Sequence, residues 1–221
     1  MRLKAWVTRS FFRWLARDFI ALFTALPERT RFFRRLKTHW EWAQKFLAKP
    51  SLLGVIDTYG IELIHPRRHG RSPNSLFEKG ISNHRWIVGG KLCLAVNHLG
   101  QVIGWAWAGA NAHDSWFHPI IEAFKDQSVI LADTGFHAKE GYPVNMKTCR
   151  KGEWNDRMLI ETVNSMLTVV CHTKKMRHRV ADYFKAHLAF IVAAFNILVA
   201  WYGLPADETG FVPLSIAEFS L

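Results

Sequence analysis

Apolar residues gather in short runs separated by polar segments. Two of these runs, LLGVID (52–57) and SVILAD (128–133), end in an aspartate. Apolar runs of this length are typical of buried β-strands. Residues 86–96 and 102–108 also have strand character, and residues 97–100, Asn-His-Leu-Gly, suit a hairpin turn between them. The pattern therefore predicts at least four strands.

Longer segments have the spacing of helices. Residues 155–170 place apolar side chains at helical intervals, residues 115–124 also look helical, and residues 181–202 are apolar enough to form a mostly buried helix. Residues 65–80 and 137–152 are polar, contain glycine and basic side chains, and predict loops. Strands followed by helices around a mixed sheet indicate an α/β fold.

The first 49 residues differ from the rest because they are rich in arginine, lysine, tryptophan and phenylalanine. Pro27 predicts a break between two helices, since proline is tolerated at a helix start but interrupts a helix interior. The second helix is predicted over residues 28–48. We therefore expect a basic helical segment at 1–49, followed by an α/β domain at 50–221.

The charge balance indicates a polyanionic partner. The chain has 221 residues, a formal net charge of +11 and a pI of about 9.9. Such a surplus favours nucleic acid first and an anionic membrane surface second. The most apolar stretch, residues 188–201, is shorter than the roughly 20 residues of a membrane helix and contains Asn196. We therefore expect no membrane association.

The cysteines and the basic amino terminus suggest the compartment. Cys93, Cys149 and Cys171 are far apart and odd in number, and without a CxxC pair they support neither a zinc ribbon nor a disulfide framework. Arginines interrupt the first twenty residues, which does not fit a secretory signal. These features predict a cytoplasmic, nucleoid-associated protein with reduced thiols.

Three carboxylates are candidates for metal chemistry. Asp57 and Asp133 each end an apolar run, and ligand sites of open α/β sheets gather at strand ends. Glu161 lies in the helical stretch WNDRMLIETVNSML. Attack on a phosphodiester can be catalysed by two Mg²⁺ ions held by carboxylates, with waters and substrate phosphates completing the coordination.

Several of these residues have simpler interpretations. A single aspartate after a strand is usually a turn former or a helix cap. Asp114 or Ser115, in ANAHDS, is predicted to cap the following helix. Trp105 and Trp107 are predicted to pack in the core, and His137 is expected to be a loop residue.

The ordered segments VIDTYGIEL, GKLCLAVNHLGQVIGWAWAGANAHDS, VILADTGFHA and NDRMLIETVNSML resemble the DDE transposases of bacterial insertion sequences. The resemblance covers residues 53–198. It implies a ribonuclease-H-like mixed sheet flanked by helices. It also implies a triad of Asp57, Asp133 and Glu161 that binds two Mg²⁺ or Mn²⁺ ions. Such enzymes cleave DNA at the ends of a mobile element and join the freed 3′ hydroxyl to target DNA.

Many relatives carry a signature around the glutamate, and Trp154, Arg157 and Glu161 match its spacing. The lysine that completes the signature is replaced by Thr168, and Lys174 and Lys175 are candidates to substitute for it. The full set of predicted DNA contacts comprises Trp154, Arg157, Lys174, Lys175, Arg67, Arg68, Arg71, Arg31, Arg34 and Arg35.

The amino-terminal segment LPERTRFFRRL (26–36) resembles the region that precedes the catalytic core of these transposases. Relatives carry a longer DNA-binding region there, so the resemblance implies a short or amino-terminally truncated copy. It also implies a homodimer on double-stranded DNA and no small-molecule substrate. Two alternatives remain: a ribonuclease-H-like nuclease without strand transfer, and a catalytically inactive DNA-binding derivative.

Overall fold

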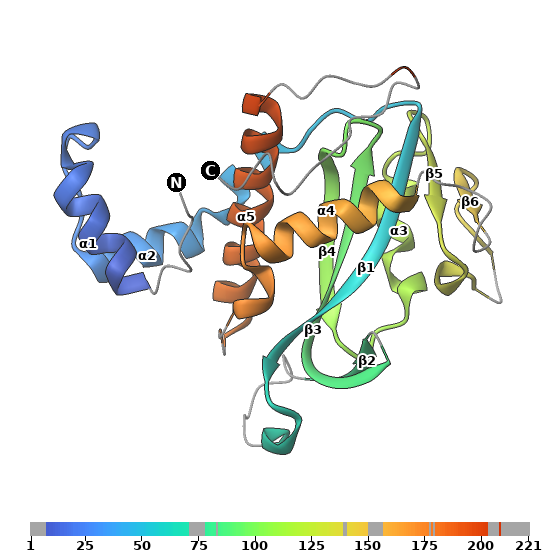
Figure 1. Cartoon of the computed structure of the whole chain (residues 1–221), viewed down its shortest axis with the longest axis horizontal. Coiled ribbons are helices and arrows are strands. Elements are labelled where there is room, and N and C mark those ends of the chain that lie inside the picture. Colours follow the sequence, from blue (N-terminus) through green and yellow to red (C-terminus); the bar gives the residue numbers. More distant parts are fainter. Residues whose placement is uncertain are drawn as a thin grey trace.

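The structure is a computed structural model of the whole chain, drawn in Figure 1. It describes residues 8–70, 78–82, 84–138, 141–149, 157–176, 178, 180–202 and 208. Within these ranges, the side chains of Thr8, Arg9, Arg68, Arg157, Met158 and Lys175 lie outside what is described.

A six-stranded mixed sheet forms the centre of the protein. The strands are β1 (Leu53–Ile64), β2 (Glu78–Ser82), β3 (Arg85–Asn97), β4 (Val102–Gly109), β5 (Val129–Ala132) and β6 (Met146–Thr148). Their order is β2-β3-β1-β5-β6, and β4 also pairs with β3. β3 is antiparallel to β1, β2 and β4, whereas β5 is parallel to both β1 and β6.

Helices surround this sheet. The α-helices are α1 (Thr8–Asp18), α2 (Arg29–Thr38), α3 (His118–Glu122), α4 (Arg157–Val169) and α5 (Ala181–Tyr202). Short 3₁₀ helices are η1 (Ile20–Leu22), η2 (Trp40–Phe46), η3 (Pro66–Arg68), η4 (Asp114–Phe117), η5 (Thr134–Phe136) and η6 (Thr173–Lys175).

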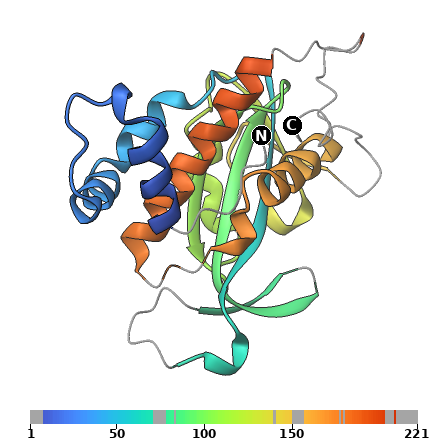
Figure 2. The same ribbon diagram turned by 60° about the vertical axis from the view of Figure 1, so that its left-hand side comes forward.

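The sheet separates two hydrophobic cores. On one face, Val55 and Leu131 pack with residues of α4 and α5, including Ile160 and Phe184. On the other face, Ile56 and its neighbours pack with η4, α3 and η5. Figures 1 and 2 show α4 and α5 on the same side of the sheet, with α4 crossing over β1. This is a three-layer α/β arrangement, which confirms the predicted α/β class with a mixed sheet and flanking helices.

The predicted strands and the turn at 97–100 are confirmed. Gly100 has φ of 72°, a left-handed conformation that glycine adopts without a steric penalty. The Asn97 side chain accepts hydrogen bonds from the backbone N–H groups of Leu99 and Gln101 at 3.1 and 3.0 Å. Asparagine and glycine therefore stabilise this hairpin in the way their residue types predict.

Both predicted loops contain a short strand. The loop prediction at 65–80 was wrong for β2, which pairs with β3, and the one at 137–152 was wrong for β6, which pairs with β5. Both strands are short and lack a run of apolar residues. Their conformation depends on backbone pairing with neighbouring strands, which periodicity does not reveal.

The prediction of a continuous helix over 28–48 was also wrong. α2 ends at Thr38, and a 3₁₀ segment follows from Trp40 to Phe46. Packing against α5 explains the change, because Ala43 is buried against Ala189 and Ala193. The side-chain amide of Asn196 also donates to the carbonyl of Phe46 at 2.8 Å.

The helix α5 is held in the protein interior. It is long and apolar enough to cross a membrane by length and composition alone, but more than half of its most apolar window is buried in the fold. Asn196 is buried within it and binds both the N–H and the C=O of Val102 on β4. Trp105 and Trp107 pack beside α5, as predicted, and Trp107 makes an edge contact with Phe184.

Candidate metal-binding and DNA-binding site

Asp57 lies on β1, and Asp133 directly follows β5, the parallel strand beside β1. The register of β1 and β5 pairs Leu53 with Val129 and Val55 with Leu131. Asp57 lies two residues beyond Val55 on β1, and Asp133 lies two residues beyond Leu131, just past the last residue of β5. Neighbouring strands are about 4.8 Å apart. The two strands whose apolar runs end in these acids are neighbours, as predicted, but Asp133 itself lies in the turn after β5 and not on the strand.

The two aspartates also follow residues that face the same core. Side chains alternate between the faces of a strand, so Asp57 shares the face of Val55 and Tyr59, which belong to the core beneath α4 and α5. Asp133 follows Leu131 by two residues and is itself extended, with φ of −80° and ψ of 176°. Asp57 therefore belongs to the sheet face that α4 crosses, and Asp133 lies just past the end of β5, where the chain turns into η5.

Helix α4 brings a polar side chain directly to Asp57. The side-chain amide of Asn164 donates to Oδ2 of Asp57 at 3.2 Å, across 107 residues of sequence. Glu161 precedes Asn164 by three residues, so the two share one side of the helix. Glu161 is exposed. The helix therefore places Glu161 about one turn from the residue that touches Asp57.

The three carboxylates do not form a ready-made metal site. Among the described residues, no group of three His, Cys, Asp or Glu side chains is close enough to hold an ion. One feature nevertheless suits a cation. The side-chain oxygen of Asn164 is buried and has no hydrogen-bond partner within the described part of the chain. A buried, unsatisfied oxygen beside a carboxylate matches the oxygen ligands and ordered waters that Mg²⁺ prefers.

Asp133 has a structural contact of its own. One of its carboxylate oxygens accepts from the backbone N–H of Gly135 at 2.9 Å and caps η5. The ordinary interpretation of an aspartate after a strand is thus correct for this residue. It does not conflict with metal binding, because a carboxylate can accept several contacts.

Asp114 is not a helix cap, which corrects the prediction. The side chain of His113 accepts from the N–H of Ser115 in that position. Asp114 instead accepts from Nζ of Lys91 at 2.9 Å and from the hydroxyl of Thr58 at 2.8 Å. Its partners come from two strands, so tertiary contacts determine its role.

The pKa of the buried Cys93 thiol is affected by the charges near it. Cys93 pairs in register with Thr58 on β1. Burial raises the pKa of the Cys93 thiol well above its ordinary value, and the carboxylates of Asp57 and Asp114 raise it further, while Lys91 acts in the opposite direction. Asp57, Asp114 and Lys91 therefore surround one part of the sheet and share its electrostatic field.

One predicted phosphate contact lies near the acids. Nζ of Lys174 is 5.8 Å from the ring centroid of Tyr59, two residues after Asp57 on the same strand face. Lys174 is exposed. Thr168, at the signature position, instead donates to the backbone carbonyl of Asn164 at 2.8 Å. Lys174 thus places a positive charge over Tyr59, the residue two positions after Asp57 on β1.

Other predicted contacts lie further away or outside the described residues. Arg67 is exposed in η3, beyond the far end of β1. Trp154 and Arg71, and the side chains of Arg68, Arg157 and Lys175, lie outside what the structure describes.

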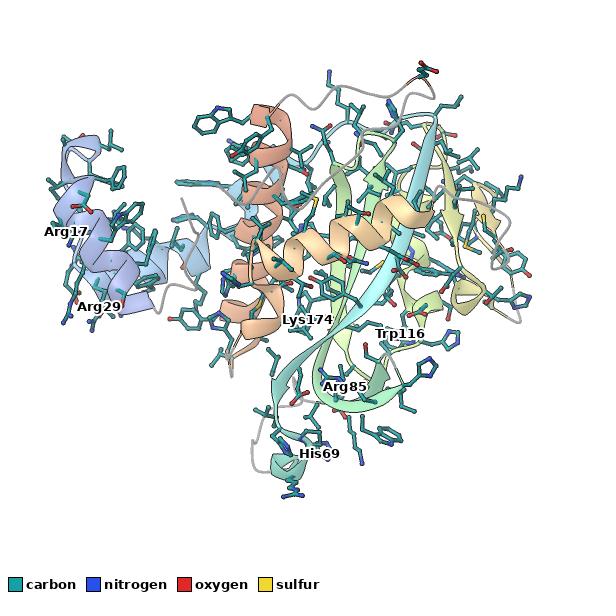
Figure 3. The ribbon with its side chains drawn as sticks, in the orientation of Figure 1. Arg17, Arg29, His69, Arg85, Trp116 and Lys174 are labelled. Atoms are coloured by element: carbon teal, nitrogen blue, oxygen red, sulfur yellow. The ribbon has the colours of Figure 1, made fainter. Side chains whose placement is uncertain are left out.

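Arg31, Arg34 and Arg35 are exposed on α2. Figure 1 places α1 and α2 at one end of the molecule and β5 and β6 at the other. In Figure 3, Arg17 and Arg29 lie beyond α5, far from the labelled Lys174. The amino-terminal cations therefore form a surface separate from the carboxylates.

Sequence reasoning did not single out Asn164, Lys91 or Thr58. Helix spacing was the available signal for Asn164, because it lies one turn after Glu161. No local signal pointed to Lys91 or Thr58, whose contacts to Asp114 span 23 and 56 residues.

Comparison with protein-family models, curated proteins and solved structures finds no match to this chain. The functional argument therefore depends on the geometry of the carboxylates and on the charge of the surface.

Proposed function

We propose that this protein is a metal-dependent DNA transposase of the DDE type. One observation carries the proposal: Asp57 lies on β1, on the sheet face crossed by the helix that carries Glu161, and Asp133 directly follows β5, the parallel strand beside β1. Carboxylates at neighbouring strand ends are suited to hold divalent ions against a phosphate backbone.

The topology of the sheet supports a ribonuclease-H-like core. β1, β3 and β4 form an antiparallel meander, and β5 and β6 extend it on the other side of β1 in parallel orientation. β1, which carries Asp57, lies between β3 and β5 in the sheet. Helices on both faces complete the arrangement.

The residues present suit a site for two Mg²⁺ or Mn²⁺ ions. Asp57 and Asp133 would hold both ions and Glu161 the second, while the amide of Asn164 orients Asp57. Because Glu161 is exposed on α4, it is free to approach when DNA binds. The chemistry that bound ions supply is activation of the attacking hydroxyl and stabilisation of the leaving oxygen.

Cations of the chain would hold the DNA. Lys174, whose ammonium lies over the ring of Tyr59 on the strand that carries Asp57, is a candidate contact for a DNA phosphate, and Arg31, Arg34 and Arg35 offer a second surface for duplex DNA. We further propose a homodimer that joins two element ends, acting in the cytoplasm at the nucleoid.

The decisive experiment is nicking of duplex DNA as a function of Mg²⁺, compared between the wild type and Asp133→Asn. We expect metal-dependent nicks with the wild type and none with the variant. Equal nicking by both proteins would refute the proposal. Strand transfer from a pre-cut 3′ end then separates a transposase from a nuclease. Metal-independent DNA binding without any cleavage would identify an inactive derivative.

A further inference from the structure

A partly buried ion pair lies on the sheet face opposite Asp57, next to the strand residue that follows it. Nζ of Lys91 on β3 and Oδ1 of Asp114 at the start of η4 are 2.9 Å apart, and their side chains are only 15% and 20% exposed. The hydroxyl of Thr58, the residue after Asp57, donates to the same oxygen at 2.8 Å. Asp114 is therefore tied to the strand that carries the first acid.

The other oxygen of Asp114 approaches the turn that carries the second acid. A methyl group placed on Gly135 would stand 2.6 Å from Oδ2 of Asp114 and 3.0 Å from Oδ1 of Asp133. Any other residue at this position would force one or both carboxylates to shift. The same turn is held a second time, because Nε2 of His118 contacts the carbonyl oxygen of Phe136 at 2.7 Å.

Stability alone is a poor explanation for this pair. Removing two charges from water costs free energy that their attraction often fails to recover, and apolar residues of similar volume are commonly as stable. Lys91 and Asp114 nevertheless stand on the sheet face whose neighbours, Cys93 and Ala95, belong to an apolar core. A charged pair at such a place is better explained if it is needed to hold neighbouring segments in a fixed position.

We infer that Asp114, neutralised by Lys91 and held by Thr58, is a positioning residue for the metal site. It fixes the turn after Asp133 against the strand that carries Asp57, so that the two acids keep one separation and one orientation. This role rests on the proposed function, because it presupposes that Asp57 and Asp133 bind metal. Partners behind metal ligands commonly change metal affinity by about 10–100-fold when they are lost.

The test is Mn²⁺ binding to the full chain, measured by isothermal titration calorimetry without DNA. We expect Asp114→Asn to weaken Mn²⁺ affinity by about 10-fold or more, because the partly buried Lys91 loses its counter-charge and the side chain that lies against the turn is no longer held in place. Thr58→Val removes one hydrogen bond without leaving a charge unpaired, and should weaken affinity by a few-fold. The matched control is Asp182→Asn, which removes the exposed pair between Lys37 and Asp182 and should leave affinity unchanged.

The outcomes separate the two proposals. If Asp57→Asn abolishes Mn²⁺ binding but folded Asp114→Asn binds Mn²⁺ with wild-type affinity, the positioning role is overturned. Should Asp114→Asn fail to fold, wild-type affinity in Thr58→Val overturns it in the same way. If Asp57→Asn binds Mn²⁺ as well as the wild type, or the wild type does not bind, the proposed function itself fails. A loss of affinity in Asp114→Asn and Thr58→Val but not in Asp182→Asn supports the inference.

Discussion

Nδ2 of Asn164 on α4 donates a hydrogen bond to Oδ2 of Asp57 on β1 at 3.2 Å. This contact joins the helix that carries Glu161 to the strand that carries the first acid. The oxygen of the same amide is buried without a partner among the described residues. Asn164 thus orients the carboxylate of Asp57 through its NH₂ group, while its Oδ1 atom remains an acceptor without a hydrogen bond beside Asp57.

We expect Asn164→Ala to reduce metal-dependent nicking about 10-fold at a fixed, subsaturating Mg²⁺ concentration, and to raise the half-saturating concentration. The physical reason is that Asp57 loses the donor that fixes its orientation. Ser165→Ala is the matched control, since Ser165 is the next residue of α4 and is exposed. An unchanged Mg²⁺ dependence in Asn164→Ala would show that the contact has no role in metal binding.

Replacing the three candidate metal ligands should affect DNA cleavage but not DNA binding. Asp57→Asn, Asp133→Asn and Glu161→Gln keep the size of each side chain and remove the charge that holds metal. Each should abolish nicking of supercoiled DNA while leaving duplex binding, measured by fluorescence anisotropy, close to wild type. Near wild-type nicking by any two of them would rule out the triad.

Gly135 provides a steric test of the same site. The added methyl of Gly135→Ala would press on Asp114 and Asp133 at 2.6 and 3.0 Å. Misplacement of a reacting group by about 1 Å can cost about 100-fold in rate, so we expect nicking to fall by 10- to 100-fold. Gly90→Ala, whose methyl would meet the Phe184 ring at 3.1 Å, is a control for crowding elsewhere in the sheet. Equal losses in both variants would indicate general destabilisation.

Asn196 should contribute strongly to stability. Its side chain accepts from the N–H of Val102 at 2.8 Å and donates to the carbonyls of Val102 and Phe46 at 2.7 and 2.8 Å. Asn196→Leu would leave these buried backbone groups short of partners. We expect a loss of about 3 kcal/mol in the free energy of unfolding, measured by urea denaturation. A loss below about 1 kcal/mol would mean that water or a backbone shift satisfies them.

The parts of the site that follow from local sequence were predictable. Apolar runs ending in Asp57 and Asp133 predicted two strands, and the periodicity of α4 predicted the helix that carries Glu161. Adjacency of the two acids followed from the rule that sites gather at strand ends. These features depend on residues that are close in sequence, where hydrophobic periodicity gives a direct signal.

The remainder depends on contacts between distant segments. Asp114 precedes a helix and was predicted to cap it, but its partners Lys91 and Thr58 come from two strands of the sheet. The break in the helix at 28–48 depends on packing of Ala43 against α5. In both cases a tertiary contact overrides a local preference, and nothing in the local sequence reveals the partner.

The basic residues of α2 should contribute to duplex binding in proportion to their number. Arg31, Arg34 and Arg35 are exposed, so replacing them with glutamine should leave the fold intact. Deleting residues 1–49 is a weaker experiment, because it removes η2 from α5 and exposes the apolar surface that Ala43 covers.

Each phosphate contact contributes about 0.9 to the slope of log K against log salt for duplex DNA. The triple variant should therefore lower the magnitude of that slope by up to about 3. Nicking per bound complex should be unchanged, because α2 lies at the opposite end of the molecule from β5 (Figure 1). The control replaces Arg67, which is exposed beyond the far end of β1, and should change the slope by at most about 1. An unchanged slope in the triple variant would mean that α2 faces a partner other than DNA.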